Sequence, residues 1–115
     1  MDIMVIKMKY RNRLELYGSF YIENELGEIA KEYRKIKDVY CNIIPQHGGT
    51  FEMSDTGLQG AYTIQRIFVR KKSIKDPKID MYFKDEQGNK YEVLDFFLNY
   101  KNNAEWEFRT RINYE

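Results

Sequence analysis

The sequence contains too few cysteines and histidines for covalent or metal-based stabilisation. Its one cysteine, Cys41, excludes an internal disulfide, and with the one histidine, His47, it is too little for a Cys/His zinc site within a single chain. Long apolar runs are also missing, because residues 3–6 form a run too short for a secretion signal or a membrane span. We therefore expect a cytoplasmic protein without metal, cofactor or membrane contact, in which Cys41 stays reduced.

Charge of one sign is not in excess either. The 19 Lys and Arg residues balance 18 Asp and Glu residues and leave a net charge of +1. This balance argues against a nucleic-acid coat or a membrane-surface protein, because both need a field of one sign over the whole chain. Any basic contact must therefore be local.

Helix-favouring residues are scarce. Ala and Leu together total nine residues, whereas Val, Ile, Thr, Tyr, Phe and Trp total 38. Branched and aromatic side chains fit a pleated surface and lose rotamer freedom in a helix, so the composition predicts a mainly all-β chain. The length of 115 residues suits one domain. We assign residues 1–10 to an N-terminal arm and residues 11–115 to a single β-barrel domain.

Alternating and apolar segments predict about six antiparallel strands. They cover residues 13–22, 29–37, 39–44, 61–70, 79–83, 90–97 and 106–112, with turn formers at residues 24–28 and 85–89. Gly18 interrupts the first segment and suits a bulge or bend. Short connections between so many strands favour a small antiparallel barrel or rolled sheet with one long loop.

The long loop is predicted for residues 46–60. Pro45 is expected to end the preceding strand, since it lacks the N–H that a ladder needs. Several glycines follow and no periodicity of either kind is sustained. Loops of this length in a compact domain are usually functional or disordered, so we expect a pliable segment.

No group of residues has the pattern of a catalytic site. His47 lies in the predicted loop without a rigid frame to pair it with Cys41, so an ordinary solvated histidine is favoured. The carboxylates have no spacing that would set two of them in one cleft. The glycines match neither a phosphate loop nor a dinucleotide fingerprint. We expect no enzymatic activity.

A local excess of positive charge begins in the fourth predicted strand segment and continues beyond it. It comprises Arg66, Arg70, Lys71, Lys72, Lys75 and Lys78, with only Asp76 against it. With Tyr62 and Phe68 on the same strand, this basic patch has the composition of a single-strand nucleic-acid groove. The alternative, which the balanced net charge favours, is a lysine-guarded strand end that discourages edge pairing.

Taken in order, these segments resemble the head-tail joining (head closure) proteins of tailed bacteriophages and their prophage relatives. The resemblance covers residues 13–114. It rests on Arg13-Leu14-Glu15-Leu16 with the turn at residues 24–28, on residues 39–45 before a glycine-rich loop with Glu52, on Ile67-Phe68-Val69-Arg70 followed by Ile74, and on Met81-Tyr82-Phe83 paired with Lys90-Tyr91-Glu92-Val93 across Gly88.

This resemblance implies a virion structural protein that assembles as a ring beneath the portal and closes the DNA exit channel. The partners would be further copies of the chain, the portal or adaptor protein and tail proteins, with a passing contact to packaged DNA. Assembly would take place in the cytoplasm of the bacterial host, and the protein would end at the head-tail interface of the virion. The loop facing the channel would carry His47, Gly48, Gly49, Thr50, Glu52, Asp55, Gly57 and Gly60.

Two alternatives remain open at this stage. One is a tail-terminator or tail-completion protein, which also forms rings and is similarly small. The other is an oligonucleotide-binding barrel that uses Arg66, Arg70, Lys71 and Lys72 with Tyr62 and Phe68.

Overall fold

The chain folds into six β-strands. The computed structural model describes residues 9–53, 58–99 and 104–114, and within these it leaves out the side chains of residues 47, 50–53 and 58–60. The strands are β1 (Asn12–Glu23), β2 (Ile29–Met53), β3 (Leu58–Arg70), β4 (Tyr82–Lys84), β5 (Lys90–Leu98) and β6 (Glu105–Tyr114), with a short 3₁₀ turn, η1 (Lys71–Ser73), after β3. The predicted all-β class and the number of strands are confirmed. Within the described ranges, no helix is long and apolar enough to cross a membrane.

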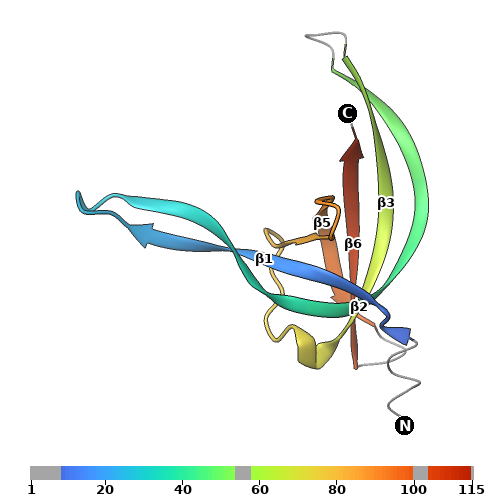
Figure 1. Cartoon of the computed structure of the whole chain (residues 1–115), viewed down its shortest axis with the longest axis horizontal. Helices are drawn as coiled ribbons and strands as arrows, with labels where there is room; N and C mark the ends of the chain where they lie inside the picture. Colours follow the sequence, from blue (N-terminus) through green and yellow to red (C-terminus); the bar gives the residue numbers. More distant parts are fainter. Residues whose placement is uncertain (1–8, 54–57, 100–103, 115) are drawn as a thin grey trace.

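The strands close into one antiparallel barrel in the order β1-β2-β3-β6-β5-β4 (Figure 1). Closure depends on the short strand β4, which pairs with β1 through Leu16 and Phe83 and with β5 through Phe83 and Tyr91. A closed barrel leaves no unpaired strand edge in its wall, which protects a chain so rich in β-structure from edge-to-edge association.

The core lies inside the barrel and takes side chains from every strand. Phe83 and Phe108 are fully buried and meet edge to face, with ring centroids 5.1 Å apart. Around them lie Leu14, Leu16, Val39, Cys41, Ile67, Val69, Ile74, Tyr91, Val93 and Ile112. This apolar interior supplies the main stabilisation, because burying each large side chain contributes roughly 1.5–3 kcal/mol.

The residues just before β1 pack against the start of β6. Tyr10 is buried, and its hydroxyl donates a hydrogen bond of 2.7 Å to the Glu105 carboxylate at the start of β6. Lys9 lies 3.1 Å from the same carboxylate. The last residues of the expected N-terminal arm therefore pack against the barrel, while residues 1–8 lie outside the described part of the chain.

Strand β2 is 25 residues long and belongs to two hairpins. Its first half pairs with β1, and from Cys41 onward it pairs with β3. Ile36 and Gln46 each lie at a register shift, which marks a β-bulge where the strand can bend. The bend suggested by Gly18 is thus present, but the extra residue is Ile36 on the partner strand.

The expectation that Pro45 ends its strand was wrong. Pro45 pairs with Gln65 beside the second bulge, where the regular ladder is interrupted and the missing N–H costs little. The strand then continues to Met53.

The predicted loop over residues 46–60 was also wrong for most of its length. Ladder pairs run from His47 with Ile64 to Met53 with Leu58, so the segment is a β-hairpin. A Cβ at Gly49 would lie 2.6 Å from the Tyr62 hydroxyl, and one at Gly48 would lie 3.0 Å from the Tyr62 carbonyl oxygen. These glycines allow β3 to approach closely. From the sequence alone they indicated only a pliable segment. Residues 54–57, including Asp55 and Gly57, lie outside the described part of the chain.

Candidate functional site

The feature that distinguishes this barrel is a hairpin that extends beyond it. We call residues 18–36 the β1–β2 arm. Within the described chain, β1 and β2 pair only with each other over these residues, because β4 ends its pairing at Tyr17 and β3 begins at Cys41. Figure 1 shows the arm leaving the barrel wall and extending away from it.

The far end of the arm is a well-defined turn. The Asn24 side-chain oxygen accepts hydrogen bonds of 2.9 Å from the backbone N–H groups of Leu26 and Glu28. Gly27 has a φ of +79°, a conformation that glycine adopts without strain. The predicted turn at residues 24–28 is confirmed, and its internal bonds hold the backbone of Leu26 in place.

The arm is unusually apolar for an exposed hairpin. More than half of the large hydrophobic side chains that are exposed in the described chain lie on it, namely Phe20, Tyr21, Leu26, Ile29, Tyr33 and Ile36. Leu26 is 83% exposed and Ile29 is 72% exposed. Exposed apolar side chains that are concentrated on one element mark an interaction site more often than scattered single residues do.

Aromatic stacking stiffens the root of the arm. Tyr17 and Tyr82 lie parallel with ring centroids 4.9 Å apart, and Tyr33 leans against Tyr82 at 5.7 Å. The Lys90 ammonium lies 4.4 Å from the centre of the Tyr82 ring. These contacts join β1, β2, β4 and β5 where the arm leaves the barrel.

Asp80 ties the arm to the segment before β4. The Ser19 hydroxyl donates a hydrogen bond to Asp80, and the Lys31 ammonium lies 3.3 Å from the same carboxylate. The hydrogen bond from Ser19, followed by Lys31, lowers the pKa of Asp80. The carboxylate is therefore charged at neutral pH and holds both strands of the arm.

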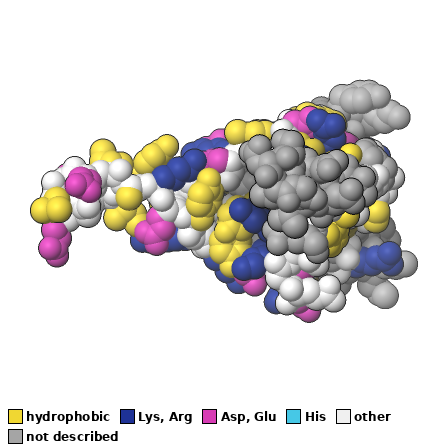
Figure 2. Space-filling model, turned by 90° about the horizontal axis from the view of Figure 1, so that it is seen from above, with side chains coloured by type: hydrophobic (Ala, Val, Ile, Leu, Met, Phe, Trp, Pro, Cys, Tyr) yellow, Lys and Arg dark blue, Asp and Glu magenta, His cyan; other side chains and the backbone are white. Residues whose placement is uncertain are grey.

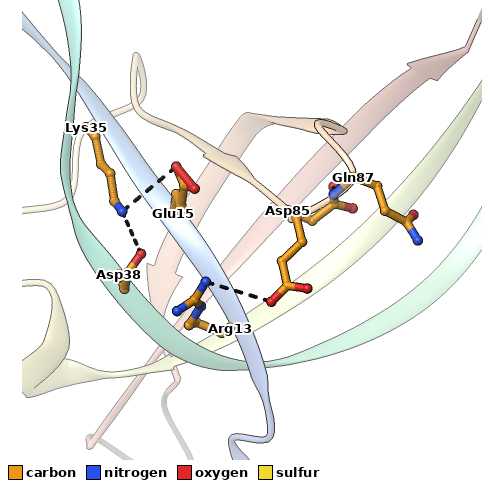
Figure 3. A network of polar contacts seen from close by, with 7 residues as sticks. Arg13, Glu15, Lys35, Asp38, Asp85 and Gln87 are labelled. Atoms are coloured by element: carbon orange, nitrogen blue, oxygen red, sulfur yellow. Dashed lines mark hydrogen bonds and ion pairs between the residues drawn. The ribbon is translucent and has the colours of Figure 1, made fainter.

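A network of polar contacts links β1, β2 and the β4–β5 turn beside the arm (Figure 3). Lys35 lies 3.0 Å from Asp38 and 4.0 Å from Glu15, and its hydrogen bond lowers the pKa of Asp38. Arg13 lies 3.7 Å from Glu86 in the β4–β5 turn. These groups are exposed and each pair contributes little, so the network orients the strands more than it stabilises them.

One residue of the predicted basic patch, Arg66, is engaged by a carboxylate. Arg66 makes two hydrogen bonds to Glu107, and its guanidinium lies 4.9 Å from the centre of the buried Phe68 ring. Arg70, Lys71, Lys72, Lys75 and Lys78 are exposed around η1 and the segment after it. Phe68 is thus buried and Arg66 is held by Glu107, and the use of this patch as a nucleic-acid contact stays a prediction.

The residues predicted to face the channel belong to the β2–β3 hairpin. Gly48 and Gly49 lie on its β2 strand, and the backbones of His47, Thr50, Glu52 and Gly60 are also within the ladder. The structure does not describe the side chains of these last four residues. Their orientation toward a channel stays a prediction.

Cys41 is placed as the sequence suggested, on a strand and facing the core. It is fully buried, and burial raises the pKa of its thiol to about 12. A thiol of this kind is a poor nucleophile at neutral pH. Among the described residues, no three His, Cys, Asp or Glu side chains gather closely enough to hold a metal ion.

Comparison with known proteins yields likeness of fold only. No protein-family model and no curated protein matches the sequence. Solved structures resemble the fold, and the following two are examples. A chain in the virion of a native gene transfer agent particle aligns with a TM-score of 0.64 at 10% identity, over 89% of this chain and 93% of that one. Protein SF1141 from Shigella flexneri 2a aligns with a TM-score of 0.64 at 15% identity, over 97% of this chain and 96% of that one.

The arm itself was missed by the reading of the sequence. Phe20 and Ile22 continue the alternation of Leu14 and Leu16, so all four fit one strand with one buried face. The alternation within one strand does not show which other strands pair with it. The signal available was the length of the segment, which continues well beyond the short strand β4 that must cover it.

Proposed function

We propose that this chain is a structural component of a phage-like virion that joins head to tail. Copies of it would form a ring beneath the portal, close the DNA exit channel and offer a docking surface to the tail. The ring would be assembled in the host cytoplasm and would remain at the head-tail interface. The role is mechanical, and no step of it requires a reacting group.

The observation that carries this proposal is the extent of the likeness to the gene transfer agent chain. The two chains share one barrel over nearly the whole length of both, with 89% and 93% covered. Fold alone does not determine function. The role therefore also depends on surfaces that suit assembly.

The β1–β2 arm supports the proposal with a surface of this kind. The β1–β2 arm carries exposed apolar side chains that a solitary subunit leaves in water. A ring requires two different patches on each subunit that meet head to tail and close by rotation. An extended arm is suited to this geometry, because it reaches beyond the barrel that carries it.

In this proposal the β2–β3 hairpin has the channel-facing role that was expected of the long loop over residues 46–60. Its ladder pairs extend to Met53 and Leu58, so gating by a long flexible loop no longer supports the proposal. A hairpin that faces the ring axis would narrow the channel by its position. The channel-facing role of this hairpin is a prediction.

Electron microscopy of the assembled components tests the proposal. The chain would be mixed with the portal protein encoded beside it and imaged by negative stain. We expect rings of the chain seated on the portal complexes, whereas the persistence of free monomers beside bare portals would contradict the proposal. The same genomic neighbourhood should contain capsid and tail reading frames.

A pull-down separates head closure from tail completion. A head-closure protein is expected to bind the portal or its adaptor, whereas a tail terminator is expected to bind the tail tube. Capture of the tail-tube protein alone would move the assignment to tail completion.

A further inference from the structure

The tip of the β1–β2 arm combines an apolar side chain with negative charge. Leu26 is 83% exposed at the end of the turn, and Glu23, Glu25 and Glu28 lie around it. Figure 2 shows acidic side chains gathered with hydrophobic ones at this far end of the arm. The tip therefore has the chemistry of an apolar anchor surrounded by carboxylates.

A cavity at the root of the arm has the opposite character. It is open to solvent, has a volume of about 290 Å³ and lies between β1, β2 and the segment after β3. Leu16, Ile36, Ile74 and Met81 give it apolar walls. The volume lies just below the range of about 300–1,000 Å³ that is typical of ligand pockets, which is the size expected for a site that accepts one apolar side chain and not a whole ligand.

The rim of this cavity is basic. Lys37, Lys72 and Lys75 line it against a single carboxylate, Asp76. The Lys37 ammonium donates a hydrogen bond of 2.6 Å to the Ser73 carbonyl oxygen, which holds that lysine at the edge. Among the described residues, no carboxylate lies within ion-pairing distance of Lys72 or Lys75.

We propose that the arm tip of one copy docks in the cavity of a second copy, with Leu26 in the apolar space and the tip glutamates on the lysine rim. The inference rests on the proposed ring-forming function and names its interface. One chain cannot make this contact with itself, because the tip is the far end of the arm and the cavity is at its root (Figure 1).

The complementarity argues for a second copy rather than an unrelated partner. The tip carries three glutamates, whereas the rim carries three lysines and one aspartate. The two surfaces of one chain therefore have net charges of opposite sign. Opposite charges accelerate encounter and fix the register, while burial of Leu26 supplies affinity. The two surfaces differ, so the contact is head to tail and can propagate into a ring.

Sedimentation of the full chain over a concentration series tests the contact. Leu26→Ser removes the anchor and leaves the turn intact, because only the backbone of Leu26 bonds to Asn24. Lys72→Glu reverses one charge on the rim. Each change is expected to weaken self-association by about tenfold or more, which corresponds to about 1.4 kcal/mol. Tyr40→Ser, at a residue of β2 that is 60% exposed and lies outside both the arm and the cavity, and Lys78→Glu outside the cavity are the matched controls and should associate like the parent chain.

Mixing provides a second, sharper readout. Glu25→Lys and Lys72→Glu should each associate poorly alone, whereas their mixture should associate again, because each supplies the surface that the other lacks. Oxidative crosslinking detects weak contacts, and a mixture of Leu26→Cys with Lys75→Cys should give a linked dimer in higher yield than Tyr40→Cys with Lys75→Cys. Parent-like association of Leu26→Ser, failure of the mixture, or equal crosslinking of the control would overturn the proposal.

The outcomes also separate this inference from the proposed function. Rings on the portal that tolerate Leu26→Ser would remove the tip-in-cavity contact and leave the head-tail role standing. Tip-dependent assemblies that bind neither portal nor tail tube would keep the contact and remove the head-tail role.

Discussion

Arg66 on β3 holds Glu107 on β6 by two hydrogen bonds, 3.1 Å from Nε and 2.9 Å from an Nη atom. The pair is diagonal in the sheet, because Phe68 is the direct partner of Glu107. The same outer wall carries Arg109 on Asp95 and Arg111 on Glu92. Much of the balanced charge of the chain is therefore used between neighbouring strands, where it favours the native register.

The Arg66–Glu107 pair should show measurable coupling. The side chains are 34% and 12% exposed, so the pair is partly shielded from water and has bidentate geometry. A double-mutant cycle with Arg66→Ala and Glu107→Ala is expected to give about 1 kcal/mol of coupling in urea unfolding. The more exposed Arg109–Asp95 pair is the control and should give a smaller value that falls further in high salt. Equal coupling in the two pairs would contradict this ranking.

Shortening a core aromatic should destabilise the barrel more than the same change on its surface. Phe83 is fully buried against Phe108, so Phe83→Leu leaves a cavity and is expected to cost about 1–2 kcal/mol of unfolding free energy. Phe97 is 47% exposed, and Phe97→Leu should change stability by less than about 0.5 kcal/mol. Chemical denaturation of both variants makes the comparison.

Stability should fall in alkaline solution. Burial raises the pKa of Cys41 to about 12, and burial with the nearby Asp85 raises the pKa of Tyr91 to about 12. The unfolded chain loses these protons at lower pH than the folded chain does. Their stabilising contribution is therefore complete below the ordinary values of about 8.5 for Cys and about 10 for Tyr, and it is lost as the pH rises toward 12.

Urea unfolding at a series of pH values measures this effect. The double variant Cys41→Ala, Tyr91→Phe is expected to start less stable and to lose less stability between about pH 8 and about pH 10.5. Tyr21→Phe on the exposed arm is the control and should follow the parent chain. Parallel curves for the parent and the double variant would show that these two groups are not responsible.

The turn between β4 and β5 should depend on Gly88. This residue has a φ of +87°, and Asp85 accepts hydrogen bonds from the backbone N–H groups of Gln87 and Asn89 around it. A Cβ at Gly88 meets nothing within 4 Å, so Gly88→Ala should be penalised by backbone strain alone, at about 1 kcal/mol. Gly88→Asn should cost less, because Asn tolerates this region better. Thermal unfolding of both variants distinguishes strain from crowding.

Strands and turns could be predicted wherever the information is local. The turns at residues 24–28 and 85–89 follow from Asn24, Gly27, Asp85 and Gly88, whose side chains or positive φ build the turn by themselves. The alternation of residues 61–70 and 106–112 likewise gave two strands that the structure pairs directly.

Local reasoning was wrong where a partner strand changes the meaning of a residue. Pro45 and the two glycines after it signal a loop in isolation, yet a bulge accommodates the proline, and the close approach of Tyr62 accounts for the glycines. The hydrogen bond of Arg66 to Glu107 on the neighbouring strand likewise could not be predicted from the segment around Arg66.

The sequence by itself determined the class of the fold, its turns and the absence of a disulfide, because composition, alternation and cysteine number act without reference to distant residues. Only the tertiary structure decided that one end of the first hairpin closes the barrel and the other extends from it. The reason is physical: a strand buries its apolar face only over the length that other strands cover, and β4 covers just three residues of β1. The exposed arm and the cavity at its root both follow from that difference in length.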